Sequence, residues 1–392
     1  MTIIHCIEQQ TTRLPREALS EADAELIWAR YGKKMDLREP TRQNHYQWQL
    51  LSEGWVGIFP LRDGLTIQVQ PKVPLHSLFG MWDYVYDLNL LIDRRELYAC
   101  DTVIGFYSRL ALALAQRVLN RVRKGLARAY VPQTERLPYL AGKLQVREHA
   151  QTPWQTTLPC AYEDHSADIA DNQIIAWVLH LILHGGECEP AVQTLLRKAY
   201  RALAGTVSLR PCAPADCVGR HYDRLNADYR PMHVLCQFFL EHISPSHLSG
   251  DHQALPFQVD MTRLFERFVA AWLWQHLPTQ WQVAAQERVE IGTSGALHFK
   301  IDLIIRDLAG QVQWVLDTKY KASHTPAPND IQQIVTYAEL KGCHNGILIY
   351  PAAITQAVFN VGNKRIRALA FDLGLPIAQA GAAFLWQLQQ VN

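Results

Sequence analysis

Two strand-like runs near the C-terminus constrain the fold of this chain more than any other segment. Residues 299–306 and 311–317 are rich in β-branched and aromatic side chains, and the turn-forming residues 307–310 separate them. If Arg306 pairs with Gln311, the apolar side chains of both runs lie on one face, because side chains alternate along a strand. A slip of one residue would bury the charged side chains, so the sequence predicts a β-hairpin in this register.

The opposite face of the predicted hairpin carries Asp302, Asp317 and Lys319. In this register the two aspartates are diagonal cross-strand neighbours, roughly 7–8 Å apart at the backbone, so their carboxylates can converge on one ion. Paired carboxylates suit Mg²⁺, or Mn²⁺ in its place, and a nearby lysine can position or deprotonate an attacking water or neutralise charge on phosphorus. An ordinary hairpin with a solvated charged face is the alternative interpretation of so short a pattern.

Segments on either side of the hairpin predict an α/β sandwich around it. Residues 259–276 have the apolar spacing of a helix, and residues 281–291 are typical of a strand. A second helix is predicted over residues 328–340, followed by a buried strand over 346–351. The order helix, three strands, helix, strand leaves room for one site at the edge of the sheet.

The two helices that flank the hairpin supply three further candidates for the same site. Glu266 is placed to add a third carboxylate, whereas a surface ion pair with Arg263 or Arg267 is the alternative. Gln333 and Tyr337 lie one turn apart on one face of the second helix.

The layout Asp302-x₁₄-Asp317-x-Lys319 on a hairpin resembles the catalytic core of the PD-(D/E)XK nucleases. The chain is also similar to the McrC family, nuclease subunits of McrBC-type restriction systems, in segments that occur in matching order. These segments are residues 54–59, 65–73, 125–130, 137–144 and 171–175, with the resemblance continuing to about residue 351. The resemblance assigns metal ligation to Asp302 and Asp317 and the role of catalytic lysine to Lys319. Ile301 stands where the motif name has proline, which supplies no ligand.

The resemblance implies a magnesium-dependent DNA endonuclease subunit that acts in a modification-dependent, antiviral restriction system. It also implies an oligomeric AAA+ GTPase of the McrB type as partner and methylated double-stranded DNA as substrate. The chain has no G-x-x-x-x-G-K-[ST] loop, so nucleotide hydrolysis would need a separate polypeptide. Two alternatives remain open: a non-catalytic subunit that bridges DNA and activates an AAA+ motor, and a free-standing repair nuclease.

Length, composition and the resemblance together predict an α+β, multidomain chain in three parts. Residues 1–93 are expected to form a small β-rich module, with a strand at 2–7 and a hairpin at 55–70, that docks onto the partner. Residues 94–250 are expected to be a mostly helical linker that contacts DNA. Residues 251–392 are expected to form the PD-(D/E)XK-type α/β nuclease core.

A helix predicted over residues 105–130 has one basic face. Such a face suits contacts to DNA phosphates, which position a protein without reading sequence. A solvated face, with acidic partners elsewhere in the fold or on another subunit, is an equally good interpretation. The basic residues are Arg117, Arg121, Lys124 and Arg128.

Bulk properties favour a cytoplasmic protein that does not contact membranes. The eight cysteines include no CxxC pair and the first residues are not a secretory leader, which indicates a reducing compartment. The longest apolar run, residues 174–183, is too short to cross a bilayer. Cys212, Cys217 and His221 have poor spacing for a structural zinc site, which is therefore not favoured.

Overall fold

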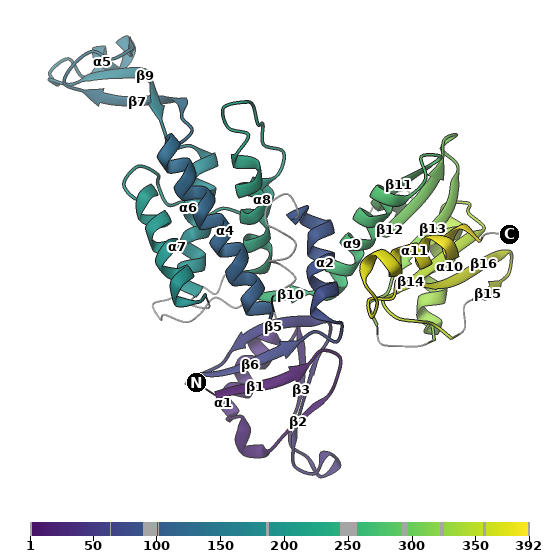
Figure 1. Ribbon diagram of the computed structural model, residues 1–392. Helices are drawn as coiled ribbons and strands as arrows, with labels where there is room; N and C mark the ends of the chain where they lie inside the picture. Colours follow the sequence, from purple (N-terminus) through teal and green to yellow (C-terminus); the bar gives the residue numbers. More distant parts are fainter. Residues whose placement is uncertain are drawn as a thin grey trace. The chain divides into compact units, whose positions relative to one another are not determined.

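The architecture is mixed α/β and multidomain, and the chain divides into two compact units (Figure 1). One unit combines residues 1–101 with 256–392, and the other comprises residues 102–255. The first and third of the three parts expected from the sequence therefore share one unit. The computed structural model describes residues 2–62, 64–88, 100, 102–185, 188–243, 257–291, 297–321, 325–355 and 358–390.

The N-terminal part of the first unit contains a four-stranded sheet whose last strand comes from beyond residue 256. The strand order is β1 (Thr2–Ile7), β6 (Leu65–Gln70), β5 (Trp55–Pro60) and β10 (Gln258–Asp260). β1 runs parallel to β6, whereas β5 pairs antiparallel with both β6 and β10. The predicted strand at 2–7 and the hairpin at 55–70 are confirmed. β10 lies at the point where the sequence predicts the start of a helix.

A second, smaller sheet completes this N-terminal module. Its order is β2 (Thr12–Leu14), β4 (Trp48–Ser52) and β3 (Met35–Arg38). Helical segments lie between these strands: η1 (Arg16–Ala18), α1 (Glu21–Leu26), the π-helical turn η2 (Ile27–Tyr31) and η3 (Arg42–Asn44). Ser20 and Asp23 cap α1 by accepting each other's backbone N–H groups. Buried Tyr31, Trp48 and Phe59 belong to one hydrophobic core that joins both sheets.

Two helices link the N-terminal sheets to the remainder of the unit. Helix α2 (Leu75–Tyr86) packs against α9 (Met261–His276), which follows β10 directly. The Asp260 carboxylate caps α9 by accepting the N–H of Arg263 at 3.0 Å. α2 ends at Tyr86, and the last part of the helix predicted over residues 75–91 lies outside the described residues.

The C-terminal part of the unit is a six-stranded mixed sheet. Its order is β11 (Trp281–Ile291), β12 (Leu297–Asp307), β13 (Val312–Thr318), β14 (Asn345–Tyr350), β16 (Lys364–Ala370) and β15 (Val358–Val361). β11, β12 and β13 are antiparallel, and β13, β14 and β16 run parallel. Helix α10 (Pro328–Leu340) packs on β13, β14 and β16, whereas α9 contacts β11 and β13, and α11 (Ile377–Gln389) contacts β16.

The predicted hairpin is present, but its predicted register is wrong. Arg306 pairs with Val312 rather than Gln311, and the register shifts between Ile305 and Arg306. The cause is the turn, because the Asp307 carboxylate accepts the N–H groups of Ala309 and Gln311, both at 2.9 Å, and holds a wider loop.

The alternative interpretation, an ordinary hairpin with a solvated charged face, does not describe the structure. The consecutive residues Leu303, Ile304 and Ile305 are all fully buried, as are Val315 and Leu316. Both faces of β12 and β13 are therefore covered, as is usual where helices pack on a sheet containing parallel strands. The carboxylates of this hairpin consequently lie at the end of a buried strand pair and not on an open surface.

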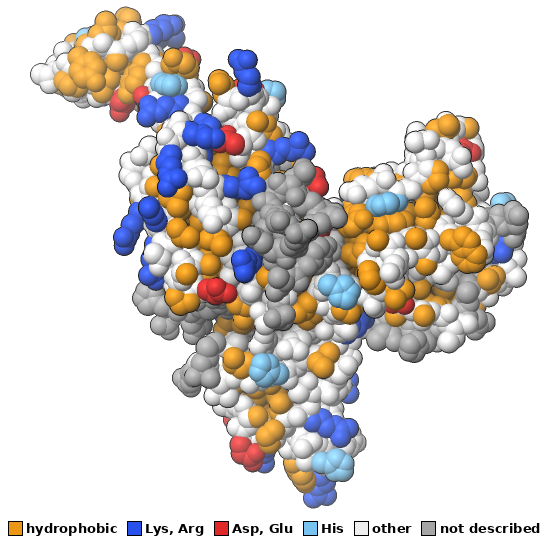
Figure 2. Space-filling view, in the orientation of Figure 1, with side chains coloured by type: hydrophobic (Ala, Val, Ile, Leu, Met, Phe, Trp, Pro, Cys, Tyr) orange, Lys and Arg blue, Asp and Glu red, His pale blue; other side chains and the backbone are white. Residues whose placement is uncertain are grey.

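The second unit is helical with a small sheet at one end. Its helices are α4 (Val103–Lys124), α5 (Val146–Gln151), α6 (Ala170–Gly185), α7 (Pro190–Leu203), η5 (Pro214–Cys217) and α8 (Tyr229–His242). The sheet has the order β7 (Ala129–Leu137), β9 (Leu158–Ser166), β8 (Lys143–Leu144). Apolar side chains cover much of the surface of this small sheet that is visible in Figure 2. No helix among the described residues is long and apolar enough to span a bilayer.

The helix predicted over residues 105–130 is shorter than expected. α4 ends at Lys124 because Gly125 adopts a φ of 92°, a conformation that favours glycine. The chain then enters strand β7 at Ala129, so Arg128 lies outside the helix.

Replacing Gly57 tests the pairing of β5 with β10. Gly57 has a φ of 128°, and a Cβ there would lie 2.0 Å from the carbonyl oxygen of Phe257. Gly57→Ala should lower the free energy of unfolding by about 3 kcal/mol, because backbone strain and a backbone clash combine. Gly64→Ala is the matched control: its φ is 75° and its Cβ would meet nothing within 4 Å, so strain alone should cost about 1 kcal/mol. Equal losses in urea unfolding would contradict this explanation.

Candidate active site

The ends of β12 and β13 bring the three residues of the sequence motif together. Lys319 Nζ lies 2.6 Å from Asp317 Oδ2 in an ion pair. Asp302 Oδ2 accepts the backbone N–H of Thr318 at 2.9 Å and its hydroxyl at 3.0 Å. The Lys319 N–H donates to the carbonyl of Ile349 at 2.8 Å, which extends the β13–β14 pairing by one residue. Both aspartates are therefore anchored on the backbone segment that positions the lysine.

Asp317 is an acid held in a poorly solvated position. Its side chain is 3% exposed, and burial raises its pKa to about 7, with the charge of Asp302 raising it further and that of Lys319 opposing. Burial lowers the pKa of Lys319, but its proximity to Asp317, Asp330 and Asp302 outweighs this and raises that pKa. Lys319 is therefore an ammonium at neutral pH.

Glu266 reaches this group from α9. Its pKa is raised to about 7, mainly by burial and further by the negative charges of Asp302 and Asp317, whereas the positive charge of Lys300 lowers it. Its Oε1 atom is buried and has no hydrogen-bond partner among the described residues. The structure thus places Glu266 in the electrostatic neighbourhood of both aspartates, and no surface ion pair satisfies its inner oxygen.

Gln333 and Tyr337 join the site through a chain of hydrogen bonds from α10. The Lys319 ammonium donates to Gln333 Oε1 at 2.8 Å, and Gln333 Nε2 donates to the Tyr337 hydroxyl at 2.7 Å. Gln333 therefore orients the lysine, and Tyr337 orients Gln333. The predicted position of both residues on one helix face is confirmed.

Asp330 is a member of the site that the sequence reasoning missed. Its Oδ1 lies 4.0 Å from Lys319 Nζ and 2.7 Å from Lys321 Nζ, and its Oδ2 accepts the Tyr350 hydroxyl at 3.2 Å. In the sequence Asp330 lies in the first turn of a predicted helix, where acids commonly occur because they stabilise the helix N-terminus. Its position therefore gives no sign of a role in the site. The lysine two residues after Lys319 is the signal that could have revealed a second lysine–carboxylate pair.

A pocket of about 250 Å³ opens beside Glu266 and Asp302. Its walls are mainly small or apolar, and Trp274, whose side chain is prominent at the surface, is one of them. The lining residues are Val85, Glu266, Arg267, Ala270, Ala271, Trp274, Ala285, Gln286 and Asp302.

The donor atoms do not yet form a closed metal site. In the part of the chain that the structure describes, no three His, Cys, Asp or Glu side chains converge closely enough to hold an ion. Cys212 and Cys217 belong to no such group among the described residues. In the carboxylate group, the ammonium of Lys319 occupies a position against Asp317 that a cation would share.

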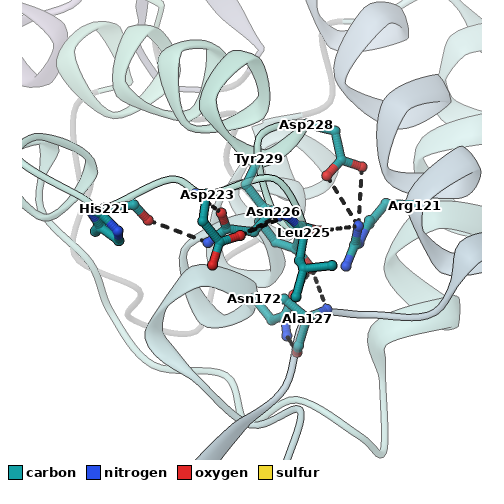
Figure 3. Close-up of polar contacts among 9 residues, drawn as sticks. All are labelled: Arg121, Ala127, Asn172, His221, Asp223, Leu225, Asn226, Asp228 and Tyr229. Carbon is teal, nitrogen blue, oxygen red and sulfur yellow. Dashed lines mark hydrogen bonds and ion pairs between the residues drawn. The ribbon is translucent and has the colours of Figure 1, made fainter.

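Arg121, one of the predicted basic residues, contacts several side chains and carbonyls of the second unit (Figure 3). Arg121 Nη1 donates to Asp228 Oδ1 and to the carbonyl of Leu225, both at 3.1 Å, and its guanidinium lies over the Tyr229 ring. Arg121 therefore has the acidic partner within the fold that the alternative interpretation expected. DNA contact by Arg117, Arg121, Lys124 and Arg128 stays a prediction.

Replacing Glu266 tests the cost of its burial. Because its pKa rises from 4.5 to about 7 on folding, the folded chain loses stability as pH increases across that interval. At pH 8 the free energy of unfolding of Glu266→Gln should therefore exceed that of the parent by on the order of 2 kcal/mol, measured as a higher unfolding temperature. At pH 5 most of that gain should vanish.

The matched control is Glu287→Gln. Burial opposes ionisation of Glu287, but hydrogen bonds from Lys341 and Arg306 outweigh it and lower its pKa. The same substitution there should reduce stability at pH 8. A destabilising Glu266→Gln at pH 8 would contradict the assignment of Glu266 as an uncompensated buried acid.

Comparison with known proteins identifies the family. A family model described as McrBC 5-methylcytosine restriction system component matches residues 50–351. The Type IV methyl-directed restriction enzyme EcoKMcrBC of Escherichia coli strain K12 is 23% identical over 218 residues, which are 51% of this chain and 58% of that protein. The chain thus matches little more than half the length of that relative.

A solved structure agrees in fold. McrC bound to McrB AAA+ hexamers of Thermococcus gammatolerans superposes with a TM-score of 0.62, with 19% identity and all of both chains covered. A second structure, the McrBC complex of the same organism, gives a TM-score of 0.45 and 21% identity over 71% of this chain and 89% of that one. With its matched region covering most of its length, the chain belongs to the McrBC 5-methylcytosine restriction system component family.

Proposed function

We propose that this chain is a DNA endonuclease subunit whose C-terminal sheet is a PD-(D/E)XK-type core that hydrolyses phosphodiester bonds with Mg²⁺. The observation that supports it most is the burial of Glu266 and Asp317 within electrostatic reach of Asp302, with Lys319 paired to Asp317. Ionised acids that are buried in a fold reduce its stability, and acids whose pKa is raised in this way concentrate at catalytic sites. A scaffold without catalysis has no use for this arrangement.

The donor set fits a hard divalent cation. Carboxylate oxygens are the ligands that Mg²⁺ and Mn²⁺ prefer, and Glu266 offers a buried oxygen without a partner among the described residues. Asp302, Asp317 and Glu266 would hold the ion, since a cation would stabilise the ionised form of two acids whose pKa is raised, first by burial and then by neighbouring carboxylates. Such an ion supplies positive charge to a phosphate undergoing attack.

Lys319 acts on water and phosphate through its positive charge. Its raised pKa keeps it protonated, so it is suited to orienting the attacking water and neutralising charge on phosphorus, not to removing a proton. Two of its three N–H donors are directed at Asp317 and Gln333, which leaves one for substrate. Gln333, itself held by Tyr337, fixes the direction of that donor.

Removing the lysine tests the catalytic assignment. Lys319→Ala should reduce cleavage of methylated DNA by at least about a hundredfold, with Mg²⁺, GTP and the partner present, because transition-state charge loses its donor. Lys341→Ala is the control, since its side chain is 17% exposed against 14% for Lys319 and is likewise paired with a carboxylate, Glu287. Lys341→Ala should cut normally. Normal cutting by folded Lys319→Ala would favour a non-catalytic, DNA-bridging subunit.

Partner and substrate follow from the family and from the relatives' names. We propose methylated double-stranded DNA as substrate and an oligomeric AAA+ GTPase of the McrB type as motor, acting together in the cytoplasm in defence against foreign DNA. Six of the cysteines, Cys6, Cys160, Cys212, Cys217, Cys236 and Cys343, are free thiols in the structure, which suits a reducing compartment. If the purified chain cuts DNA strongly without GTP or partner, a free-standing repair nuclease becomes the better description.

The N-terminal module is the first candidate for docking onto the motor. A pocket of about 430 Å³ lies on it, with Trp28 and Tyr46 in its wall, 40% and 53% exposed. The β7–β9 sheet is a second candidate, because Tyr139, Leu140 and Trp154 there are more than 60% exposed. Exposed apolar side chains gathered in one place are characteristic of protein contact surfaces.

Stimulation of GTP hydrolysis distinguishes these surfaces. If the N-terminal module docks, Tyr46→Ala should weaken stimulation at least about tenfold, by loss of a contact residue, and Trp154→Ala should not. Lys319→Ala should stimulate fully, since it touches only the carboxylate site. The opposite result for Tyr46→Ala and Trp154→Ala would assign docking to the β7–β9 sheet. Point variants are preferable to deleting residues 1–93, because β10 pairs with β5.

A further inference from the structure

A buried polar cluster joins the N-terminal sheet to the residue that follows the catalytic lysine. Tyr320 is 3% exposed, and its hydroxyl donates to Glu8 Oε2 at 3.2 Å. Gln9 Nε2 donates to the Tyr320 carbonyl at 2.9 Å, and Lys72 Nζ lies 4.1 Å from the centre of its ring. Residues just after β1 and just after β6 therefore hold the ring, the hydroxyl and the carbonyl of one tyrosine.

The cluster is unusual in burying an acid and a lysine together. Glu8 is completely buried, its Oε1 has no partner among the described residues, and burial raises its pKa to about 7. Burial also lowers the pKa of Lys72 to about 8, with Glu8 opposing. Lys72 completes the arrangement by donating to Gln9 Oε1 at 2.7 Å and by offering its backbone N–H to Glu8. An apolar contact would hold the N-terminal sheet against Tyr320 at a smaller cost in desolvation, so stability alone does not explain these polar residues.

Tyr320 contacts both elements that deliver catalytic groups. Along the chain it follows Lys319, whose backbone is fixed on its other side by Ile349. Through space its ring lies 5.8 Å from that of Phe265, the residue before Glu266 on α9. A displacement of Tyr320 would therefore move Lys319 directly and Glu266 through Phe265.

We infer that Glu8, Gln9 and Lys72 are positioning residues of the cleavage site, which hold Tyr320 and thereby set the placement of Lys319. This inference rests on the proposed nuclease function. The three residues touch neither metal nor substrate, and they act through the tyrosine. The N-terminal module accordingly has a role in catalysis besides any contact with a partner.

The test compares two removals of a buried hydroxyl from the same unit. Tyr320→Phe loses the bond to Glu8, whereas the control Tyr31→Phe loses a bond of 3.1 Å to the Pro60 carbonyl. In the full complex with GTP and Mg²⁺, Tyr320→Phe should lower kcat for cleavage about tenfold or more, with KM for DNA within about twofold, because small misplacements of catalytic groups are costly. Tyr31→Phe should leave both constants unchanged.

Two Glu8 variants test the hydrogen bond itself. Glu8→Gln keeps an oxygen acceptor for the tyrosine hydroxyl and should retain most of kcat, whereas Glu8→Ala should behave like Tyr320→Phe. A Glu8→Gln variant as defective as Glu8→Ala, with both folded, would overturn the positioning role. So would a Tyr320→Phe variant that cuts at the parental rate, or one whose loss is matched by Tyr31→Phe.

Hydrogen exchange supplies a readout that does not depend on cleavage. In the chain alone, Tyr320→Phe should increase amide exchange across residues 318–321 and 264–267 at least about threefold, and Tyr31→Phe should not. If the parent fails to cut DNA under all conditions while Lys319→Ala behaves identically, the proposed function is wrong. Exchange then decides the positioning role alone, and unchanged exchange in Tyr320→Phe would overturn it.

Discussion

The pairing of β10 with β5 is the contact on which the first unit depends. It joins residues about two hundred positions apart, and α9 begins at the residue after the paired strand. The N–H of Met261 donates to the carbonyl of Gly54 at 2.9 Å, so the first turn of α9 is attached to the β4–β5 connection. Because Glu266 lies on this helix, the N-terminal sheet determines where the third carboxylate is delivered. Packing, rather than sequence proximity, therefore assembles the site.

Electrostatics in the site follow from how its acids are buried. Asp302 is held by two donors from Thr318, whereas Asp317 has a lysine partner and Glu266 has an oxygen without one. The acids with the least compensation are the ones whose pKa is raised to about 7. Around them, Gln333 and Asp330 restrict the lysine from the α10 side. The carboxylates therefore favour binding of a cation, while the ammonium group of Lys319 stays in a fixed position beside them.

Local patterns in the sequence predicted the elements of the candidate site well. They could not predict contacts between segments that are far apart in the chain. The hairpin, the helix bearing Glu266 and the pairing of Gln333 with Tyr337 each follow from spacing over a few residues. The register failed because the Asp307 carboxylate reorganises the turn, a side-chain effect that periodicity does not contain. Glu8 has no local signal, since its partner is 312 positions away. The β7–β9 sheet was not predicted, because its exposed faces lack the apolar alternation that identifies strands.

The insertion of residues 102–255 between two parts of one unit has a consequence for synthesis. β5 and β6 emerge from the ribosome long before β10, Tyr320 and the carboxylates of β12 and β13. Contacts of such large sequence separation form late, because loop closure must precede them. Glu8 and Lys72 lack their tyrosine until then, and the proposed cutting site is incomplete until Tyr337 has been added. If the carboxylate site cuts DNA as we propose, a nascent chain cannot damage its own cell's DNA until translation has passed the last element of that site.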